Sequence, residues 1–458
     1  MMTRFCGAAG AVLFAGVAFA ETVTISPQAR YGTVKPMNGV NNGPIVVRAN
    51  RGGYGNSDTF AAAKIPFVRT HDSAFEARYG GDHTVDIHRI FPNFEADEND
   101  PQSYDFACTD NYLKEIREAG AEVFYRLGTT IEHGVKKYGS VPPKDFAKWA
   151  RICEHVIRHY NEGWADGFKW NIRYWEIWNE PDEGKTCWGG TTEQFFDLFE
   201  TAAKHLKGCF PHLKIGGYAS SGLFKLVQEK PRPHDDYTKQ CVDDFFRYVK
   251  EHKCPLDFFS IHAYDMPGAP LGYATMRAYA EFARKTLDDA GFTKTELSMN
   301  EWLPRWSKPG SDEQAARVAE VLVSLQDSPI DTAMIYDGKC GTGIYSPLFD
   351  PITELPRKAY WAMTAFNELY QLKGAVKVET ADGLRAAAAC EQEDYGAVMV
   401  VNPTVRTVPL RLDIGNGYVR WCRLTDATHD NAEVRLPEAM PPWSFVLVMT
   451  QGGRCKVK

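Results

Sequence analysis

The chain of 458 residues is 44% hydrophobic and carries a formal net charge of −7, with a pI near 6.0. A chain of this length and composition can bury a large core, which excludes an intrinsically disordered protein and leads us to expect more than one domain. Lys and Arg form no basic stripe, so a nucleic-acid partner and an anionic membrane surface are excluded. Aromatic residues reach 13%, with 11 Trp, a composition that suits stacking on flat apolar faces.

Residues 1–20 are typical of a secretory signal. An arginine is followed by an almost wholly apolar or small run, which ends in Ala-Phe-Ala before Glu21. We expect cleavage near Ala20 and export to the periplasm or the cell exterior. No other stretch approaches the roughly 18 apolar residues of a membrane span, so we expect no membrane partner after cleavage.

The eleven cysteines do not form a dense framework in a chain of this size, and their spacing does not reveal any pairing. The sequence contains neither C-x-x-C nor H-E-x-x-H, the spacings common in zinc sites. We therefore expect no metal and no organic cofactor.

Short β-type runs alternate with amphipathic helical segments through most of the chain, a pattern typical of a (β/α)₈ barrel. Predicted strands cover 66–72, 121–128, 173–180, 213–219, 257–264, 295–302 and 331–338, with an eighth in 32–44. Predicted helices cover 109–120, 142–163, 192–208, 241–252, 274–291, 312–328 and 355–372. We place the barrel at 30–372.

Beyond residue 372 the pattern changes to short alternating strands separated by Gly, Asn and Pro. This pattern is typical of an antiparallel sheet. We expect a β-sandwich domain at 373–458, and residues 21–29 are a candidate for one further strand of it.

In such a barrel the active site lies at the carboxyl ends of the strands. The polar and aromatic side chains at those ends are Arg69, His71, Asp72, Asn179, Glu180, His262, Tyr264, Asn300, Glu301, Trp302, Tyr336 and Asp337. Two of them, Glu180 and Glu301, are carboxylates on the fourth and seventh predicted strands. A facing pair of carboxyl groups is what glycoside hydrolysis requires, one to protonate the leaving oxygen and one to attack the anomeric carbon.

The segments "YWEIWNEPD" (174–182) and "MNEW" (299–302) resemble glycoside hydrolase family 39, a retaining family of clan A that includes β-xylosidases and α-L-iduronidases. The segments "VNNGP" (40–44), "VRTHD" (68–72) and "SIHAY" (260–264) are also similar to the family. The resemblance covers about residues 30–372. It implies a (β/α)₈ barrel in which Glu180 is the acid/base and Glu301 the nucleophile.

Further roles follow from this resemblance and from strand position. Asn179 is expected to hydrogen-bond the sugar 2-hydroxyl, and His262 and Tyr264 to orient Glu301 or a substrate hydroxyl. Arg69 and His71 share one strand face, and Arg69 is expected to keep Glu301 ionised. Trp302 and Asp337 are further candidates for substrate contact, and Trp188 in "DEGKTCWGG" (182–190) is a candidate sugar platform.

Glu176 has the same strand parity as Glu180 but lies four residues, roughly 13 Å, deeper in the barrel. That distance is too great for both to act on one anomeric carbon. We expect Glu176 to be structural, paired with Arg126 or Arg69.

The long loop at about 73–105 follows the second predicted strand and either walls the pocket or covers the barrel edge. It carries His83, Asp86, His88, Phe91 and Phe94.

The sequence thus predicts an exported retaining glycosidase acting on oligosaccharides or polysaccharides of plant or host origin. Xylosides, arabinosides, galactosides, glucosides and uronides stay open as substrates, as do exo or endo action and the oligomeric state. Two alternatives are a catalytically inactive carbohydrate-binding barrel and a metal-dependent hydrolase built from His71, His262 and Asp337.

Overall fold

The computed structural model describes residues 21–44, 55–71, 83–129, 139–227, 235–265, 270–339, 345–380, 383–391 and 395–452. The expected signal segment, residues 1–20, lies outside the described residues, as does the first part of the 73–105 loop. Among the described residues, no helix combines the length and the apolar character needed to cross a membrane.

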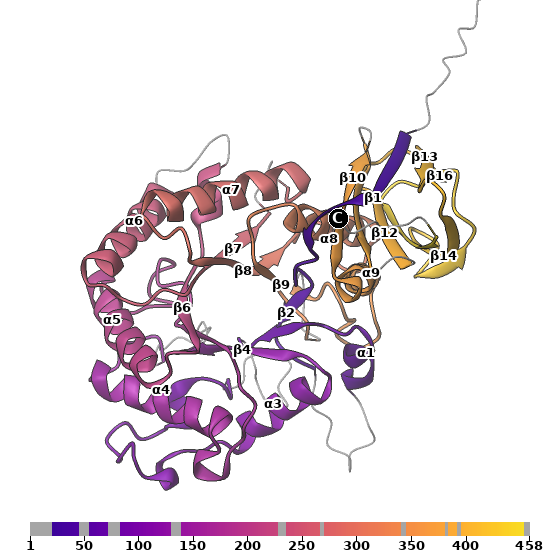
Figure 1. Cartoon of the computed structure of the whole chain (residues 1–458). Helices are drawn as coiled ribbons and strands as arrows, with labels where there is room; N and C mark the ends of the chain where they lie inside the picture. Colours follow the sequence, from indigo (N-terminus) through magenta and orange to yellow (C-terminus); the bar gives the residue numbers. More distant parts are fainter. Residues whose placement is uncertain are drawn as a thin grey trace, which may run out of the picture.

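Eight parallel strands close into a barrel, which confirms the predicted architecture (Figure 1). In order around the barrel they are β2 (Gly39–Asn41), β3 (Phe67–Arg69), β4 (Glu122–Leu127), β5 (Tyr174–Ile177), β6 (Lys214–Ser220), β7 (Phe258–Tyr264), β8 (Glu296–Leu303) and β9 (Thr332–Ile335). Strand β2 pairs with both β3 and β9 and so closes the ring.

Helices follow the strands and surround the barrel (Figure 1). They are α1 (Ser57–Ala62), α3 (Ala107–Glu118), α4 (Phe146–Asn161), α5 (Thr192–Cys209), α6 (Asp235–Glu251), α7 (Tyr273–Asp289), α8 (Asp312–Gln326) and α9 (Lys358–Leu372), with the short α2 (Ile87–Ile90) in the loop after β3. Side chains cap several of their first turns. At α5, Thr191 and Gln194 form a reciprocal capping box, and Asp145 caps α4.

The barrel interior is apolar at its floor and polar above it. Its floor consists of Phe67, Phe124, Tyr174, Phe258 and Met334, contributed by five of the strands. Side chains two residues further along a strand point to the same side, one layer higher. The next layer therefore holds Arg69, Glu176 and Ser260 above the aromatic floor, and it leads to the carboxyl ends where chemistry is expected.

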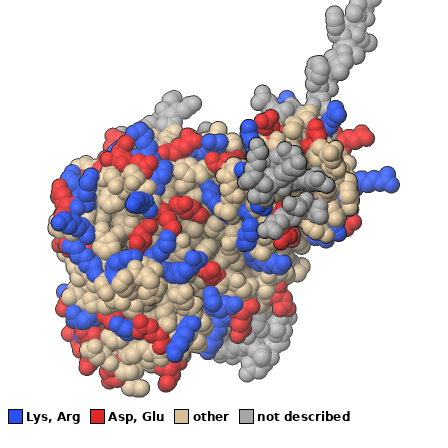
Figure 2. Space-filling model, in the orientation of Figure 1, with Lys and Arg blue, Asp and Glu red and all other residues tan. Residues whose placement is uncertain are grey.

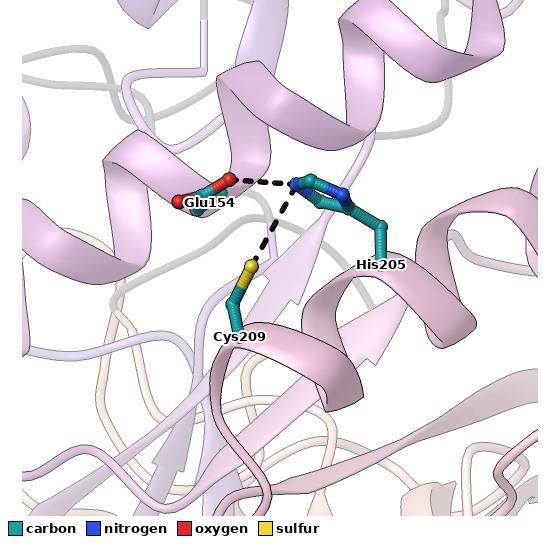
Figure 3. A group of neighbouring side chains, drawn as sticks. All are labelled: Glu154, His205 and Cys209. Carbon is teal, nitrogen blue, oxygen red and sulfur yellow. Dashed lines mark hydrogen bonds and ion pairs between the residues drawn. The ribbon is translucent and has the colours of Figure 1, made fainter.

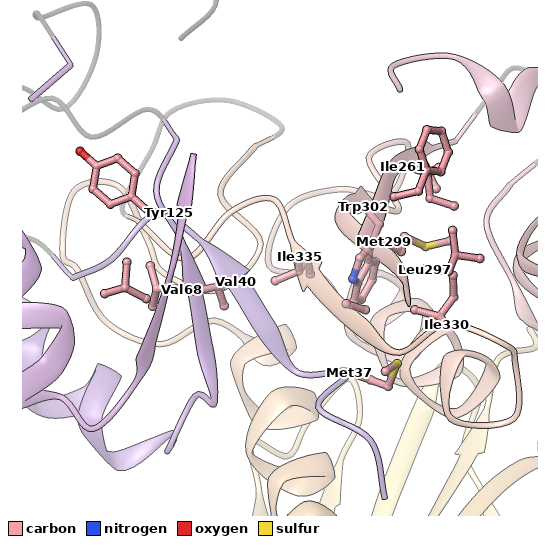
Figure 4. Close-up of a cluster of buried hydrophobic side chains, with 14 of the residues drawn as sticks. Met37, Val40, Val68, Tyr125, Ile261, Leu297, Met299, Trp302, Ile330 and Ile335 are labelled. Atoms are coloured by element: carbon pink, nitrogen blue, oxygen red, sulfur yellow. The ribbon is translucent and has the colours of Figure 1, made fainter. Parts of the chain in front are cut away.

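The outward faces of the strands carry aliphatic and aromatic side chains that pack under the helices (Figure 4). Strand β8 is irregular here. Ser260 of β7 aligns with Ser298, but His262 aligns with Glu301, so β8 contains one extra residue between these two pairs. Such a bulge re-aims the side chains that follow it.

The remaining strands form one continuous nine-stranded sheet beside α8 and α9 (Figure 1). Its order is β15 (Ala432–Val434), β14 (Tyr418–Thr425), β17 (Ser444–Gln451), β12 (Tyr395–Asn402), β11 (Arg385–Cys390), β10 (Gly374–Thr380), β1 (Glu21–Thr33), β13 (Val408–Asp413) and β16 (Ala439–Met440). The sheet is antiparallel except where β1 runs parallel to β13.

Both faces of this sheet are buried at its centre. Ala397, Met399 and Val401 of β12 belong to the barrel core, against α8 and α9. Val398 and Val400 point the other way, into a second core that includes Val23 of β1. The sheet curls around this second core, and a two-sided environment explains the unbroken apolar run in β12.

The surface carries mixed charge. Lys and Arg are interspersed with Asp and Glu over the face shown in Figure 2. On this face, positive and negative side chains lie among one another.

Candidate active site

Arg69 is fully buried in the barrel and joins the residues of the site. Its Nε donates to Glu176 Oε2 at 2.7 Å, and its Nη1 donates to Asn41 Oδ1 at 3.0 Å and to Glu301 Oε2 at 3.2 Å. Its NH2 group donates to Asn179 Oδ1 at 2.6 Å. Burial favours loss of the Arg69 charge, but Glu176 and Glu301 outweigh it and raise the pKa of Arg69. One cation thus orients side chains from β2, β5 and β8.

Glu301 lies in a cationic and hydrogen-bonding environment. Its Oε2 is 3.4 Å from His71 Nε2, in addition to the Arg69 contact, and the Tyr264 hydroxyl donates to its Oε1. Burial pushes the pKa of Glu301 upward, but His262, His71 and Arg69 outweigh it and lower the pKa to about 2. Glu301 is therefore a carboxylate at neutral pH, the state that a nucleophile requires.

Glu180 lies just beyond β5, in a left-handed backbone conformation with φ of 46°. Its Oε1 is 2.6 Å from His262 Nδ1, and the Cys187 thiol lies 3.6 Å from its Oε2. The other nitrogen of His262, Nε2, is 3.7 Å from Glu301 Oε2. The imidazole of His262 therefore lies between the two carboxylates.

Glu180 and Glu301 face each other at short range. One oxygen of Glu180, one oxygen of Glu301 and one nitrogen of His262 all lie within 4.8 Å of one another. Retaining glycosidases hold their two carboxyl groups about 5–5.5 Å apart, whereas inverting enzymes separate them by about 6.5–9.5 Å. The two carboxyl groups are therefore close enough to act on one anomeric carbon.

The structure also brings other predicted residues to this end of the barrel. Asn179 is buried, and its Nδ2 has no hydrogen-bond partner among the described residues, because only its Oδ1 is engaged by Arg69. Asp337 follows β9 and accepts a hydrogen bond from Asn42 Nδ2 at 3.2 Å. Asp337 thus lies at the same end of the barrel as Glu180 and Glu301, and the partner in this hydrogen bond is Asn42.

Trp302 does not point into the pocket, contrary to the expectation of a substrate contact. Because β8 bulges before Glu301, Asn300 and Glu301 both face the interior and Trp302 turns outward. It is fully buried near Met299 and Ile330, in the layer between strands and helices (Figure 4).

Trp188 is also part of the core, not a sugar platform. Its ring packs edge-on against Trp178 at 5.0 Å and against Phe195 at 5.7 Å, and its indole N–H donates to Thr191 O. Only 3% of the residue is exposed.

Glu176 is paired with Arg69, as one of the two alternatives predicted. Its Oε1 also accepts hydrogen bonds from Ser260 Oγ and Asn300 Nδ2, both at 2.5 Å. The other alternative, Arg126, is wrong, because Arg126 donates to Asp86 Oδ1 at 2.6 Å. Glu176 is therefore the structural counterion of the site.

The described part of the 73–105 loop packs on the barrel rim. Asp86 binds Arg126 of β4, and Phe91 and Phe94 line a cavity of about 270 Å³ together with Trp149. Phe91 also packs against Tyr104 within the loop, with ring centroids 4.8 Å apart. These contacts show how the loop covers the edge of the barrel.

Three residues of the site were not among the sequence candidates: Asn41, Ser260 and Cys187. Asn41 ends β2 and bridges Arg69 to the backbone of Asn300, with its Nδ2 2.8 Å from Asn300 O. An asparagine at a strand end was a usable signal for Asn41. Ser260 and Cys187 carried none, because their contacts depend on barrel register and on the path of the chain after β5.

Among the described residues, two groups have the ligand types and proximity of a metal site. One is Glu180, His262 and Glu301, the catalytic candidates themselves. The other is Glu154, His205 and Cys209, between α4 and α5 (Figure 3). Neither group is the set His71, His262 and Asp337 that the metal-dependent alternative requires.

A model of the family described as "Glycosyl hydrolases family 39" matches residues 71–335. Two curated β-xylosidases are similar in part. The one from Geobacillus stearothermophilus is 31% identical over 125 residues, 27% of this chain and 21% of the relative. The one from Caldicellulosiruptor saccharolyticus is 26% identical over 242 residues, 50% of this chain and 47% of the relative. The matched segments thus span less than half of these relatives.

Solved structures share the fold over nearly the whole chain. A glucosidase from Croceicoccus marinus superposes with a TM-score of 0.75 at 20% identity, covering 96% of this chain and 100% of that one. A GH39 enzyme from Xanthomonas axonopodis pv. citri gives 0.67 at 15% identity, covering 97% and 100%.

Replacing Glu176 by Gln is expected to lower the free energy of unfolding by about 3 kcal/mol, because it removes one of the two carboxylates that compensate the buried Arg69 guanidinium. Glu122→Gln is the matched control: Glu122 pairs with Arg173 at 2.9 Å, but both side chains are about half exposed. That control should change stability by less than about 1 kcal/mol. Urea denaturation measures both, and equal midpoints for the two variants would contradict the structural role of Glu176.

The pKa of Glu301, lowered from 4.5 to about 2, makes a pH-dependent contribution to stability. Folding favours the ionised form, so the stabilisation is complete above the ordinary pKa of 4.5 and is lost as the pH falls towards 2. Glu301→Gln lacks this contribution. We expect the difference in unfolding free energy, wild type minus variant, to shrink as pH falls from about 6 to about 3. A constant difference over that range, measured by denaturant titration, would refute the assignment.

Proposed function

Because the chain belongs to glycosyl hydrolases family 39, we propose that it hydrolyses O-glycosidic bonds with retention of anomeric configuration. The observation that carries this proposal is the pair Glu180 and Glu301, whose facing oxygens lie within 4.8 Å with His262 between them. Closely spaced carboxyl groups favour double displacement, because inverting enzymes need a wider gap that holds a water molecule beside the sugar.

In the first step, a Glu301 oxygen attacks the anomeric carbon and forms a glycosyl ester as the bond to the leaving oxygen breaks. Glu180 donates its proton to that oxygen. The short contact between Glu180 Oε1 and His262 Nδ1, 2.6 Å, orients the acid/base. Tyr264 and Arg69, which bind the two Glu301 oxygens, orient the nucleophile.

In the second step, ionised Glu180 takes a proton from water as the water oxygen attacks the anomeric carbon. The ester bond to Glu301 breaks, and the carboxylate is regenerated. Each step inverts the anomeric centre once, so the product keeps the configuration of the substrate. The reaction consumes one water and needs no metal or organic cofactor.

Asn179 is assigned to the sugar 2-hydroxyl. Arg69 fixes its Oδ1, which leaves the buried Nδ2 as a donor with no partner among the described residues. A buried donor without a partner is costly, and a sugar hydroxyl oxygen would satisfy it. The interaction would strengthen in the transition state.

β-Xylosides are the favoured substrate class, because both curated relatives are named β-xylosidases. Arabinosides and galactosides are the next candidates, within glycans of plant or host origin. We further propose export through residues 1–20, whose composition is that of a secretory signal.

A panel of 4-nitrophenyl glycosides tests the activity, with the β-xyloside expected to be cleaved fastest. Glu180→Gln should reduce kcat/KM by at least about 10²-fold on a substrate with a poor leaving group, and Glu301→Gln should abolish turnover. Glu183→Gln, an exposed carboxylate three residues from Glu180, is the control and should stay within about threefold of wild type.

Proton NMR of the first-formed anomer then tests the mechanism. Retention is expected, and an inverted product would overturn double displacement. Binding of xylo-oligosaccharides without cleavage of any panel member would favour the inactive carbohydrate-binding barrel. Loss of activity after chelation, restored by a divalent cation, would favour a metal-dependent hydrolase.

A further inference from the structure

Glu154, His205 and Cys209 bring carboxylate, imidazole and thiol ligands together between α4 and α5 (Figure 3). His205 and Cys209 are four residues apart on α5 and so share one helix face. Glu154 reaches them from α4, with its Oε2 2.6 Å from His205 Nε2. Cys209 Sγ is 4.0 Å from the same nitrogen, and one ligand atom of each residue lies within 4.8 Å of the others.

We propose that these three side chains form a zinc site, distinct from the catalytic carboxylates. Sulfur, imidazole nitrogen and carboxylate oxygen are the ligands that Zn²⁺ takes in tetrahedral sites, and water would occupy the fourth position. Ligand atoms bound to one Zn²⁺ would lie roughly 3.3–3.6 Å apart. The present separations, 2.6 Å between Glu154 and His205 and 4.0 Å between His205 and Cys209, lie on either side of that range. On binding, the Zn–S bond replaces the Cys209 S–H bond, and that proton passes to solvent.

Arg158 supports this geometry. Its guanidinium holds the other oxygen of Glu154, Oε1, at 2.8 Å from Nε and 2.7 Å from NH2. Oε2 is thereby directed at His205, as partners outside the coordination shell direct ligating carboxylates in metal sites. All three ligands are partly exposed, so the ion has access from solvent.

Titration of EDTA-treated protein with Zn²⁺, followed by calorimetry, should show about one strong site per chain. With Co²⁺ the complex should show a thiolate-to-metal charge-transfer band, which Cys209→Ser abolishes and His205→Gln weakens. Cys187→Ala should keep the band, because Cys187 is the thiol beside Glu180 and the metal is not expected to bind there. Cys108→Ser should also keep it, since Cys108 is an exposed thiol outside the proposed site. His252→Gln should leave the band unchanged, because the contact of His252 with Glu200 is a surface His–Glu pair that involves no thiol.

Zinc should also raise the melting temperature of wild type, and this increase should vanish in Cys209→Ser. Activity on the panel should be equal with and without zinc. If the double variant His205→Gln, Cys209→Ser binds Zn²⁺ as tightly as wild type, or if wild type binds none, the site does not exist.

A second inference concerns Cys187 and rests on the proposed function. Its Sγ lies 3.6 Å from Glu180 Oε2, whereas His262 Nδ1 lies 2.6 Å from the other oxygen, Oε1. Its backbone is fixed independently of the side chain: the Cys187 N–H donates to Gly184 O at 2.9 Å, and Trp178 Nε1 donates to Cys187 O at 2.8 Å.

We infer that Cys187 is a positioning residue that tunes the acid/base. Burial and the nearby Glu180 charge raise the pKa of Cys187, so it stays a thiol and can donate S–H to ionised Glu180. A donor to the charged form lowers the pKa of a carboxyl group. Cys187→Ala removes this donor from ionised Glu180.

Cys187→Ala should therefore move the alkaline limb of the kcat/KM profile upward by about half a pH unit, while Cys187→Ser, which keeps a donor, should leave it within about 0.2 unit. The acid limb should not move. The pH titration of the ¹³C-labelled Glu180 carboxyl, followed by NMR, should show the same shift without turnover. If neither the alkaline limb nor the NMR titration of the Glu180 carboxyl moves in Cys187→Ala, the inference is wrong. If the wild type shows no turnover, that result counts against the proposed function alone.

Discussion

A guanidinium with no access to solvent determines much of this structure. Placing the Arg69 charge inside the barrel is costly unless several acceptors surround it. Glu176 and Glu301 supply negative charge, and Asn41 and Asn179 supply neutral acceptors. The same contacts that satisfy Arg69 also keep Glu301 ionised and orient Asn179. Barrel stability and the state of the nucleophile are therefore two properties of one network, and a change in any member affects both.

The sequence was sufficient for the barrel and for the two carboxylates. Strand and helix patterns are local, and the strand-end rule needs only their order. Asn179 and Glu180 lie in a specific segment, and Glu301 was found from its position on the seventh predicted strand. The strand-end position of Asn41 was visible in the sequence, but its partner, like the partner of Ser260, depends on which residue of a neighbouring strand lies opposite. Asn41 aligns with Arg69 only through the register of β2 and β3.

The errors at Trp302 and Trp188 have a common cause. Both were placed at the pocket because they neighbour a catalytic candidate in sequence. The extra residue in β8 turns Trp302 outward, and a bulge leaves no mark in the alternation of residue types. The predicted second β-domain is present, and its strands form one mixed sheet that curls around a core of its own.

Strand β1 comes from the start of the described chain but lies inside the terminal sheet, between β10 and β13. Its partners follow it by more than 300 residues, because Val23 pairs with Thr380 and Leu412. During synthesis these residues must wait until nearly the whole chain has emerged. Long-range pairing of this kind slows folding and makes it cooperative. The sheet holds the barrel sequence between its own strands, so that loss of β1 or of β17 should loosen the same domain.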